Sequence, residues 1–527
     1  MSNTPVISLV LNIHLPFVRH PEKNISLQEG RFFNIITETC LPLLEVFDRL
    51  DSSHIPFRMG ISISPVLCHM LSDEHLLKRY LEYVDRKIDL GAEQLKEMDE
   101  QNPVYKTVKY YYNRFLDQRV LFTERYNMDI LKVFDYYQRK GRVELLTTSA
   151  THAFLPFYTK YPEVIQAQIE MATTNYRIHF EKYPLGFWLP ELGWSVELEK
   201  WFRAYNFGYT ILGTHALTYA NPPAEKGSFF PIKTPSGIFI LGRDFYADKE
   251  LNSIINNPLF RNNNFDLGFE LPQAEVKAFL GAYGSRTNTG YKCQAQNSNP
   301  YDPEEAGIKV KESAALFLKN TFERLEAAKE YMSSQPVSVC TLDAALMGTT
   351  WYEGPLFLEA LFRAAHESAG AVSQEILFMT PAEYIFKLDT RNFQVLNPEY
   401  SSMGINGYAE TWVDSSNDWI YRHTMRALER MIELAERFPD KTGLKERALN
   451  QASREILLVL ASDWPAMLYR QENSEYAKKQ LESCLRNFTT IYEALGSNHI
   501  STEWLTNLER RHNIFPNINY RIFRRKK

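Results

Sequence analysis

Two acidic residues each follow a short apolar run. Glu191 follows the run in FWLPELGW, and Asp343 follows the run in CTLDAAL. Two carboxylates that meet at one site can carry out glycosidic-bond chemistry, because one attacks the anomeric carbon while the other protonates the leaving oxygen. A carboxylate at the end of a strand can also cap the next helix or pair with an arginine. The two residues by themselves leave both interpretations open.

Other polar residues occupy the same kind of position. His14 follows the first apolar run, His152 the third and Arg243 the sixth. Imidazole and guanidinium groups can bind sugar hydroxyls and separate the pKa values of two carboxylates. Each histidine could instead be a satisfied core residue. The case for a site therefore depends on the coincidence of these residue types after successive runs.

Seven β-rich runs, separated by helical patterns, would bring these residues together. Each run is short, rich in β-branched residues and bounded by Gly, Pro or a charge, as buried strands are. Alternating strands and helices favour a parallel sheet, and seven strands predict a TIM-like (β/α)7 barrel, incomplete by one strand. Residues after the strands would then line one mouth, where such barrels carry active sites. The runs are 6–12, 57–63, 143–148, 185–190, 208–213, 238–242 and 336–342.

Three segments predict additions to this barrel. Residues 66–140 carry helical patterns and predict a helical insertion after the second strand. Residues 245–315 are rich in Asn, Gly and Pro and predict an irregular lobe over the mouth. Strand signals stop near residue 390, so we expect a catalytic domain over 1–390 and a C-terminal α-helical domain over 391–527 that contributes to the substrate groove.

Composition argues against several other classes of protein. The net charge of -5 gives no reason to expect a nucleic-acid partner. No stretch approaches the ~20 apolar residues of a membrane span, and the N-terminal run lacks the basic region of a signal peptide. The five cysteines are scattered without a CxxC pair, and HExxH is absent, so we expect neither a disulfide frame nor a metal site. Cytoplasm is the expected location.

Several long motifs resemble those of glycoside hydrolase family 57, in particular its α-amylase-type and 1,4-α-glucan branching enzymes. They include HLPFVRHPE, ATHAFLPFYTKYPEVIQAQI, FWLPELGW, LDAALMGTTWYEG, GYAETWVDSSNDWIYRH and ASDWP. The resemblance implies an incomplete barrel, no cofactor, and retention of anomeric configuration through a covalent intermediate. It implies Glu191 as the nucleophile and Asp343 as the general acid/base. The substrate contacts that follow from it are His14, His152, Trp188, Arg243, Trp351, Trp412 and Asp463.

The sequence departs from the family pattern where substrate should lie. These departures remove sugar contacts, and each lost contact typically costs ~1–3 kcal/mol when its partner is left unpaired. They are Asn12 for a common His, Asn252 for the Trp of a Gln-Val-Trp-Ser element, Ala345 for Glu, Thr349 for His, Thr350 for Trp, and Met403 for an aromatic residue.

Two hypotheses about function follow. The first is an active retaining enzyme that branches or hydrolyses α-1,4-glucan, or acts on a related sugar. The second is a glycan-binding or regulatory protein with little catalysis on the same scaffold. The sequence indicates no membrane or nucleic-acid partner and identifies no protein partner. New reducing ends or branches formed from amylose would separate the two hypotheses.

Overall fold

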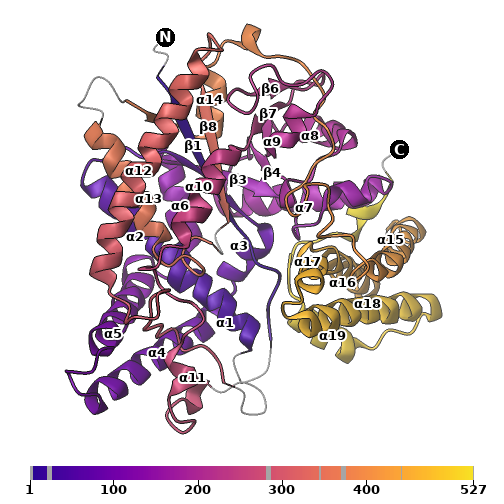
Figure 1. Ribbon diagram of the computed structural model, residues 1–527. Helices are drawn as coiled ribbons and strands as arrows, with labels where there is room; N and C mark the ends of the chain where they lie inside the picture. Colours follow the sequence, from indigo (N-terminus) through magenta and orange to yellow (C-terminus); the bar gives the residue numbers. More distant parts are fainter. Residues whose placement is uncertain are drawn as a thin grey trace.

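Seven parallel strands form the centre of the molecule (Figure 1). The computed structural model describes residues 4–20, 26–279, 286–343, 346–368, 375–440 and 442–525. Each strand overlaps one of the predicted runs, so the prediction of an incomplete (β/α)7 barrel is confirmed. The strands are β1 (Val6–Ile13), β2 (Met59–Ile63), β3 (Val143–Thr148), β4 (Phe187–Trp188), β5 (Tyr209–Leu212), β7 (Phe239–Gly242) and β8 (Val337–Asp343).

The ring consists of two sheets joined by narrow seams. The wider sheet has the order β4-β3-β2-β1-β8, and β5 pairs with β7 in the second sheet. A single residue pair forms each seam, Gly186 with Tyr209 between β4 and β5, and Arg243 with Val339 between β7 and β8. Two short strands lie outside the ring, β6 (Ile232–Lys233) antiparallel to β7 and β9 (Leu377–Phe378) beside β1.

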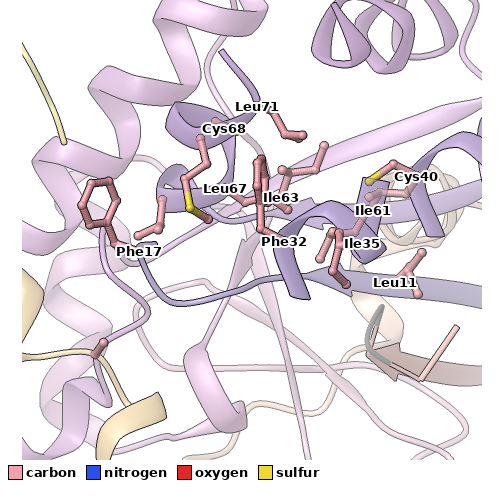
Figure 2. Close-up of a cluster of buried hydrophobic side chains, with 14 of the residues drawn as sticks. Leu11, Phe17, Phe32, Ile35, Cys40, Ile61, Ile63, Leu67, Cys68 and Leu71 are labelled. Carbon is pink, nitrogen blue, oxygen red and sulfur yellow. The ribbon is translucent and has the colours of Figure 1, made fainter. Parts of the chain in front are cut away.

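The strands are buried on both faces, as parallel strands covered by helices must be. Every residue of β1 is buried. Leu11 of β1 belongs to the large outer core, together with Ile61 and Ile63 of β2 and with Phe32 and Ile35 (Figure 2). Val6 and Val10 of β1 face a second cluster that includes Trp188 of β4. This alternation follows from the two-residue period of a strand, and it separates the barrel interior from the helical layer.

Helices surround the ring and build the predicted insertion. The insertion between β2 and β3 contains α3 (Pro65–Leu71), α4 (Glu74–Glu97), α5 (Tyr105–Val120) and α6 (Ile130–Arg139). The other helices of the barrel region are α1 (Leu27–Asn34), α2 (Leu41–Ser52), α7 (Pro162–Phe180), α8 (Glu199–Ala204), α9 (Thr214–Thr218), α12 (Pro303–Lys329), α13 (Gly354–Ser368) and α14 (Pro381–Lys387).

The segment 245–315, predicted as irregular, is irregular only in part. It contains α10 (Phe245–Ile255) and α11 (Leu267–Glu270), and α12 begins within it. The side chain of Asp244 caps α10, and Asp302 caps α12, where Pro303 occupies the first helical position. Caps and an N-terminal proline favour helix starts, and in this segment they outweigh the Asn and Gly content of the surrounding chain.

After α14, the described part of the chain contains helices and no further strand. The α-helices of this region are α15 (Trp419–Arg437), α16 (Leu444–Val459), α17 (Asp463–Arg470), α18 (Ser474–Ser497) and α19 (Thr502–Arg511). Figure 1 shows this helical region as a separate layer beside the barrel, with α17 on the side that faces the strands. Among the described helices, none combines the length and apolarity that crossing a bilayer would require.

Candidate active site

Glu191 lies in a turn directly after β4. Its backbone is left-handed, with φ of 58° and ψ of 20°, and Leu192 after it also has a positive φ. Non-glycine residues in this region are strained, and such strain persists where the surroundings hold it. Here the carbonyl of Glu191 accepts a 2.6 Å hydrogen bond from the Met403 amide. The side chain is 21% exposed and points into a cavity.

Asp343 is the last residue of β8 and its side chain is exposed. Asn12 lies beside it in register on β1. The Asn12 amide donates a 3.3 Å hydrogen bond to Oδ1 of Asp343. Asn12 therefore places a neutral amide donor beside the second carboxylate.

Two histidines form a stacked pair beneath the cavity. The rings of His14 and His152 are 3.9 Å apart and nearly parallel, at 8°. His14 Nε2 donates to Oδ2 of Asp463 at 2.9 Å, and its Nδ1 is 2.8 Å from the Ser64 hydroxyl. These contacts join the loop after β1 to α17 of the helical domain. The structure thus places two of the predicted substrate contacts, His14 and Asp463, within hydrogen-bond distance of each other.

The cluster of His14, His152 and Asp463 has donor types that could hold a metal ion. A bound zinc lies ~2.0–2.1 Å from an imidazole nitrogen, along that nitrogen's in-plane lone pair. Two nearly parallel rings 3.9 Å apart direct their lone pairs side by side, and the pairs do not converge on one point. The arrangement therefore suits hydrogen bonding better than coordination of a single ion.

The carboxyl group of Glu191 has a strongly perturbed pKa. Burial, together with the nearby charge of Asp343, raises the pKa of Glu191 to about 8, and a hydrogen bond from Ser462 opposes the rise. Burial also lowers the pKa of His152 well below its usual value, and the charge of His14 adds to that effect. His152 is consequently a neutral imidazole at physiological pH.

Two adjoining cavities share a wall that includes Asp343. The first, of about 250 Å³, is lined by Glu191, Asp343, His14, His152 and Asp463. The second, of about 270 Å³, is lined by Arg243 and Asp248. Three residues line both cavities, namely Trp188, Asp343 and Met403. Among the described residues, the indole N–H of Trp188 has no hydrogen-bond partner, so a donor is available where the cavities meet.

Two of the predicted substrate contacts lie away from these cavities. The side chains of Trp351 and Trp412 are each 1% exposed. Trp351 packs against Phe357, whereas Trp412 stacks on Phe154 at 5.4 Å. Neither ring lines the first or the second cavity. The other seven predicted site residues all do, so the structure brings together both carboxylates and five of the seven contacts.

The positions at which the sequence departs from the family pattern lie in different parts of the site. Asn252 and Thr350 line the second cavity. The carbonyl of Thr349 accepts a 3.0 Å hydrogen bond from Arg261, and the buried side chain of Arg261 also pairs with Glu38. This ion pair anchors the loop that follows Asp343. Ala345 lies outside the described residues.

Several residues that sequence reasoning did not single out belong to the site. Asp248 pairs with Arg243 in the second cavity, and burial raises the pKa of Asp248 to about 7. Arg31 and Arg470 line the far end of the first cavity. Ser462 contacts Glu191 directly. Of these residues, only Ser462 could have been found from the sequence, because it directly precedes Asp463 in the ASDWP motif.

A seven-stranded barrel with two carboxylates facing one cavity defines an enzyme of the glycoside hydrolase or glycosyltransferase type. Residues 8–397 match the model of glycosyl hydrolase family 57, and residues 423–523 match the model described as 1,4-α-glucan branching enzyme, C-terminal. The first match covers well over half of the chain. The chain belongs to glycosyl hydrolase family 57.

Individual relatives agree with this assignment. The crystal structure of an α-amylase, AmyC, from Thermotoga maritima is 33% identical, covers 99% of each chain and has a TM-score of 0.91. A branching enzyme of Pyrococcus horikoshii is 23% identical, with coverage of 100% of this chain and 98% of its own, and shares the fold with a TM-score of 0.88. A 1,4-α-glucan branching enzyme of Thermococcus kodakarensis is 25% identical over 97% of this chain and 77% of its own length.

Proposed function

We propose that the protein is a retaining enzyme that cleaves α-1,4-glucan by double displacement. The observation that carries the proposal is that Glu191 and Asp343, from the ends of β4 and β8, line one cavity. The names of the relatives, an α-amylase and two branching enzymes, support α-1,4-glucan as the substrate class.

In the proposed first step, the ionised carboxylate of Glu191 attacks the anomeric carbon. The carboxyl proton of Asp343 moves to the leaving glycosidic oxygen as the bond to that oxygen breaks. In the second step, Asp343 takes a proton from an acceptor hydroxyl, which displaces Glu191 and restores the original anomeric configuration. A water acceptor gives hydrolysis, and the 6-hydroxyl of another glucan chain gives a branch.

The composition of the cleft favours hydrolysis over branching. Trp188 is the one Phe, Tyr or Trp residue that lines either cavity within the described part of the chain, and the aliphatic side chain of Met403 lines both cavities beside it. Efficient transfer to a sugar requires that water be excluded from the intermediate. We therefore expect more new reducing ends than new α-1,6 branches.

Incubation with amylose tests the proposal. New reducing ends, with retained configuration at early times, are the expected result, and Glu191→Gln should abolish them. A second candidate function is a glycan-binding protein with little catalysis, which the exposed position of Asp343 beside Asn12 favours. Retention on an amylose column without any product, by the unmodified protein, would support that alternative.

We also propose a cytoplasmic location. All five cysteines are free and buried. Free thiols are the usual state of cysteine in a reducing compartment. Fractionation of cells that produce the protein would test this point.

A further inference from the structure

Ser462 connects the helical domain to the proposed nucleophile. Its hydroxyl donates a 2.8 Å hydrogen bond to Oε1 of Glu191. The same hydroxyl lies 3.0 Å from Nδ1 of His152. Ser462 is 2% exposed, so solvent does not compete for these contacts. A single hydroxyl from one domain therefore joins two groups that follow strands of the other.

The backbone around Ser462 fixes the position of this hydroxyl. The Ser462 amide donates to the carbonyl of His152 at 3.1 Å. The preceding residue, Ala461, forms an antiparallel bridge with Ala153. These backbone contacts hold the start of α17 against the loop that follows β3. The distance between Ser462 and Glu191 consequently depends on main-chain atoms and not on a mobile side chain alone.

The hydroxyl of Ser462 does not cap the helix that it precedes. Ser462 precedes the first residue of α17, where a serine normally accepts a hydrogen bond from a backbone N–H of the first turn. No such capping bond is present at this helix, whereas Ser26, Ser64 and Ser501 do cap theirs. A structural explanation based on helix capping therefore does not account for this serine.

The chemistry of the three groups sets the direction of the hydrogen bonds. An ionised carboxylate only accepts, and a hydroxyl has one proton to donate. Ser462 must therefore donate to Glu191 and accept from the Nδ1–H of His152. This assignment leaves Nε2 of His152 without a proton, and that buried atom has no partner in the structure.

We propose that Ser462 is a positioning residue, which holds Oε1 of Glu191 and stabilises the ionised form required for attack. The proposal rests on the function of Glu191 proposed above. It assigns the helical domain a direct part in the chemistry, because the barrel alone lacks this donor. Ser462 acts through Glu191 and contacts no reacting atom of the substrate itself.

Charges from several elements bear on the same carboxyl group. Asp343 faces Glu191 from β8, Asp463 and Arg470 act from α17, and His152 lies 3.6 Å away. After burial, the two aspartates raise the pKa of Glu191, whereas the Ser462 hydrogen bond and Arg470 lower it. Removal of the hydroxyl leaves the raising influences in place. The loss should therefore make Glu191 harder to ionise.

The first test is the dependence of kcat/KM on pH for Ser462→Ala with amylose. We expect the acid limb to move upward by about one pH unit, since a hydrogen bond to a charged group is lost. This shift predicts an activity about tenfold lower at pH 7 and only about twofold lower at pH 9, with KM little changed. Ser462→Thr, which keeps the hydroxyl, should restore most of the wild-type profile.

Ser453→Ala provides the matched control. Ser453 is a fully buried serine of α16 whose hydroxyl bonds to the Leu449 carbonyl, away from the cleft. Its variant should leave the pH profile in place. Equal losses for Ser462→Ala at every pH, or a profile identical to that of the wild type, would overturn the proposal.

A measurement without turnover separates this proposal from the proposed function. The carbon-13 signal of the Glu191 carboxyl can be identified in protein labelled with 13Cδ-glutamate as the resonance missing from Glu191→Gln. Its titration midpoint should be higher in Ser462→Ala than in the wild type. An upward shift in a protein inactive on amylose would reject the proposed function and retain the Ser462 contact. An unchanged midpoint would reject the role of Ser462 even in an active enzyme.

Discussion

Glu191 and Asp343 line the same cavity, but the residues around each of them, called here the Glu191 wall and the Asp343 wall, constrain the two carboxylates to different extents. Glu191 is mostly buried, left-handed in its backbone, and contacted by Ser462 from the helical domain and Met403 from a loop. Asp343 is exposed, and the described residues give its side chain one hydrogen bond, from Asn12 at 3.3 Å. The proposed nucleophile, Glu191, is therefore held in place by the protein, whereas the proposed acid, Asp343, is weakly constrained.

The largest expected effect separates the two carboxylates by role. Glu191→Gln and Asp343→Asn should each lower turnover of amylose by about a thousandfold or more. An aryl α-glucoside with a good leaving group needs no proton, so Asp343→Asn should still release the aryl group from it in a rapid burst. Glu191→Gln should release none. Rapid-quench measurement of the released aryl group checks both, and a burst from Glu191→Gln would reverse the assignment of the two walls.

The second prediction concerns the dependence of kcat/KM on pH, which follows from the burial of the Glu191 carboxyl group. Burial raises the pKa of Glu191 to about 8, and only the ionised form attacks. Below that pH, kcat/KM for the aryl α-glucoside, which needs no proton from Asp343, should therefore rise about tenfold per pH unit, a hundredfold between pH 5 and pH 7. Initial rates at low concentrations of the aryl α-glucoside measure this slope. A rate independent of pH over that range would show that Glu191 is ionised like a solvated carboxylate, and the contrast between the walls would disappear.

A smaller effect tests the Asp343 wall. Asn12→Ala removes the described hydrogen bond to Asp343, and because that bond is long we expect kcat to fall by only about three- to tenfold. Ser8→Ala is the control, because Ser8 lies on the same strand and its buried hydroxyl has no hydrogen-bond partner among the residues that the structure describes. Steady-state kinetics on amylose provide the measurement. A loss as large as that of the carboxylate variants would mean that this wall is as tightly organised as the other.

The smallest effect concerns the aromatic layer behind the cleft. Trp412→Phe should change KM by less than about twofold, because Trp412 is buried against Phe154 and lines neither cavity. It should lower the free energy of unfolding by about 1–2 kcal/mol through looser packing. Kinetics and thermal unfolding of the same sample check both expectations. A tenfold higher KM with unchanged stability would show that the ring touches substrate.

The strand ends could be located from the sequence, since buried parallel strands are short apolar runs with sharp limits. The run predicted at 336–342 forms β8 over Val337–Asp343, so Asp343 falls at the mouth as expected. The exposure of Trp351 and Trp412 could not be predicted, because it depends on partners distant in the chain, such as Phe154. The contact of Ser462 was also hidden, because a serine before a helix ordinarily indicates a cap.

The two narrow seams of the ring have a consequence for the width of the catalytic aperture. Glu191 follows β4 and Asp343 ends β8, and these are the two edge strands of the wider sheet. The β5–β7 pair spans the gap between those edges and is held at each side by one residue pair. Further hydrogen bonds cross the seams, from the Thr210 hydroxyl to the Phe187 carbonyl and from the Asp244 amide to the Val339 carbonyl. The separation of the two edges, and with it the room for a sugar ring, therefore depends on a small number of local contacts.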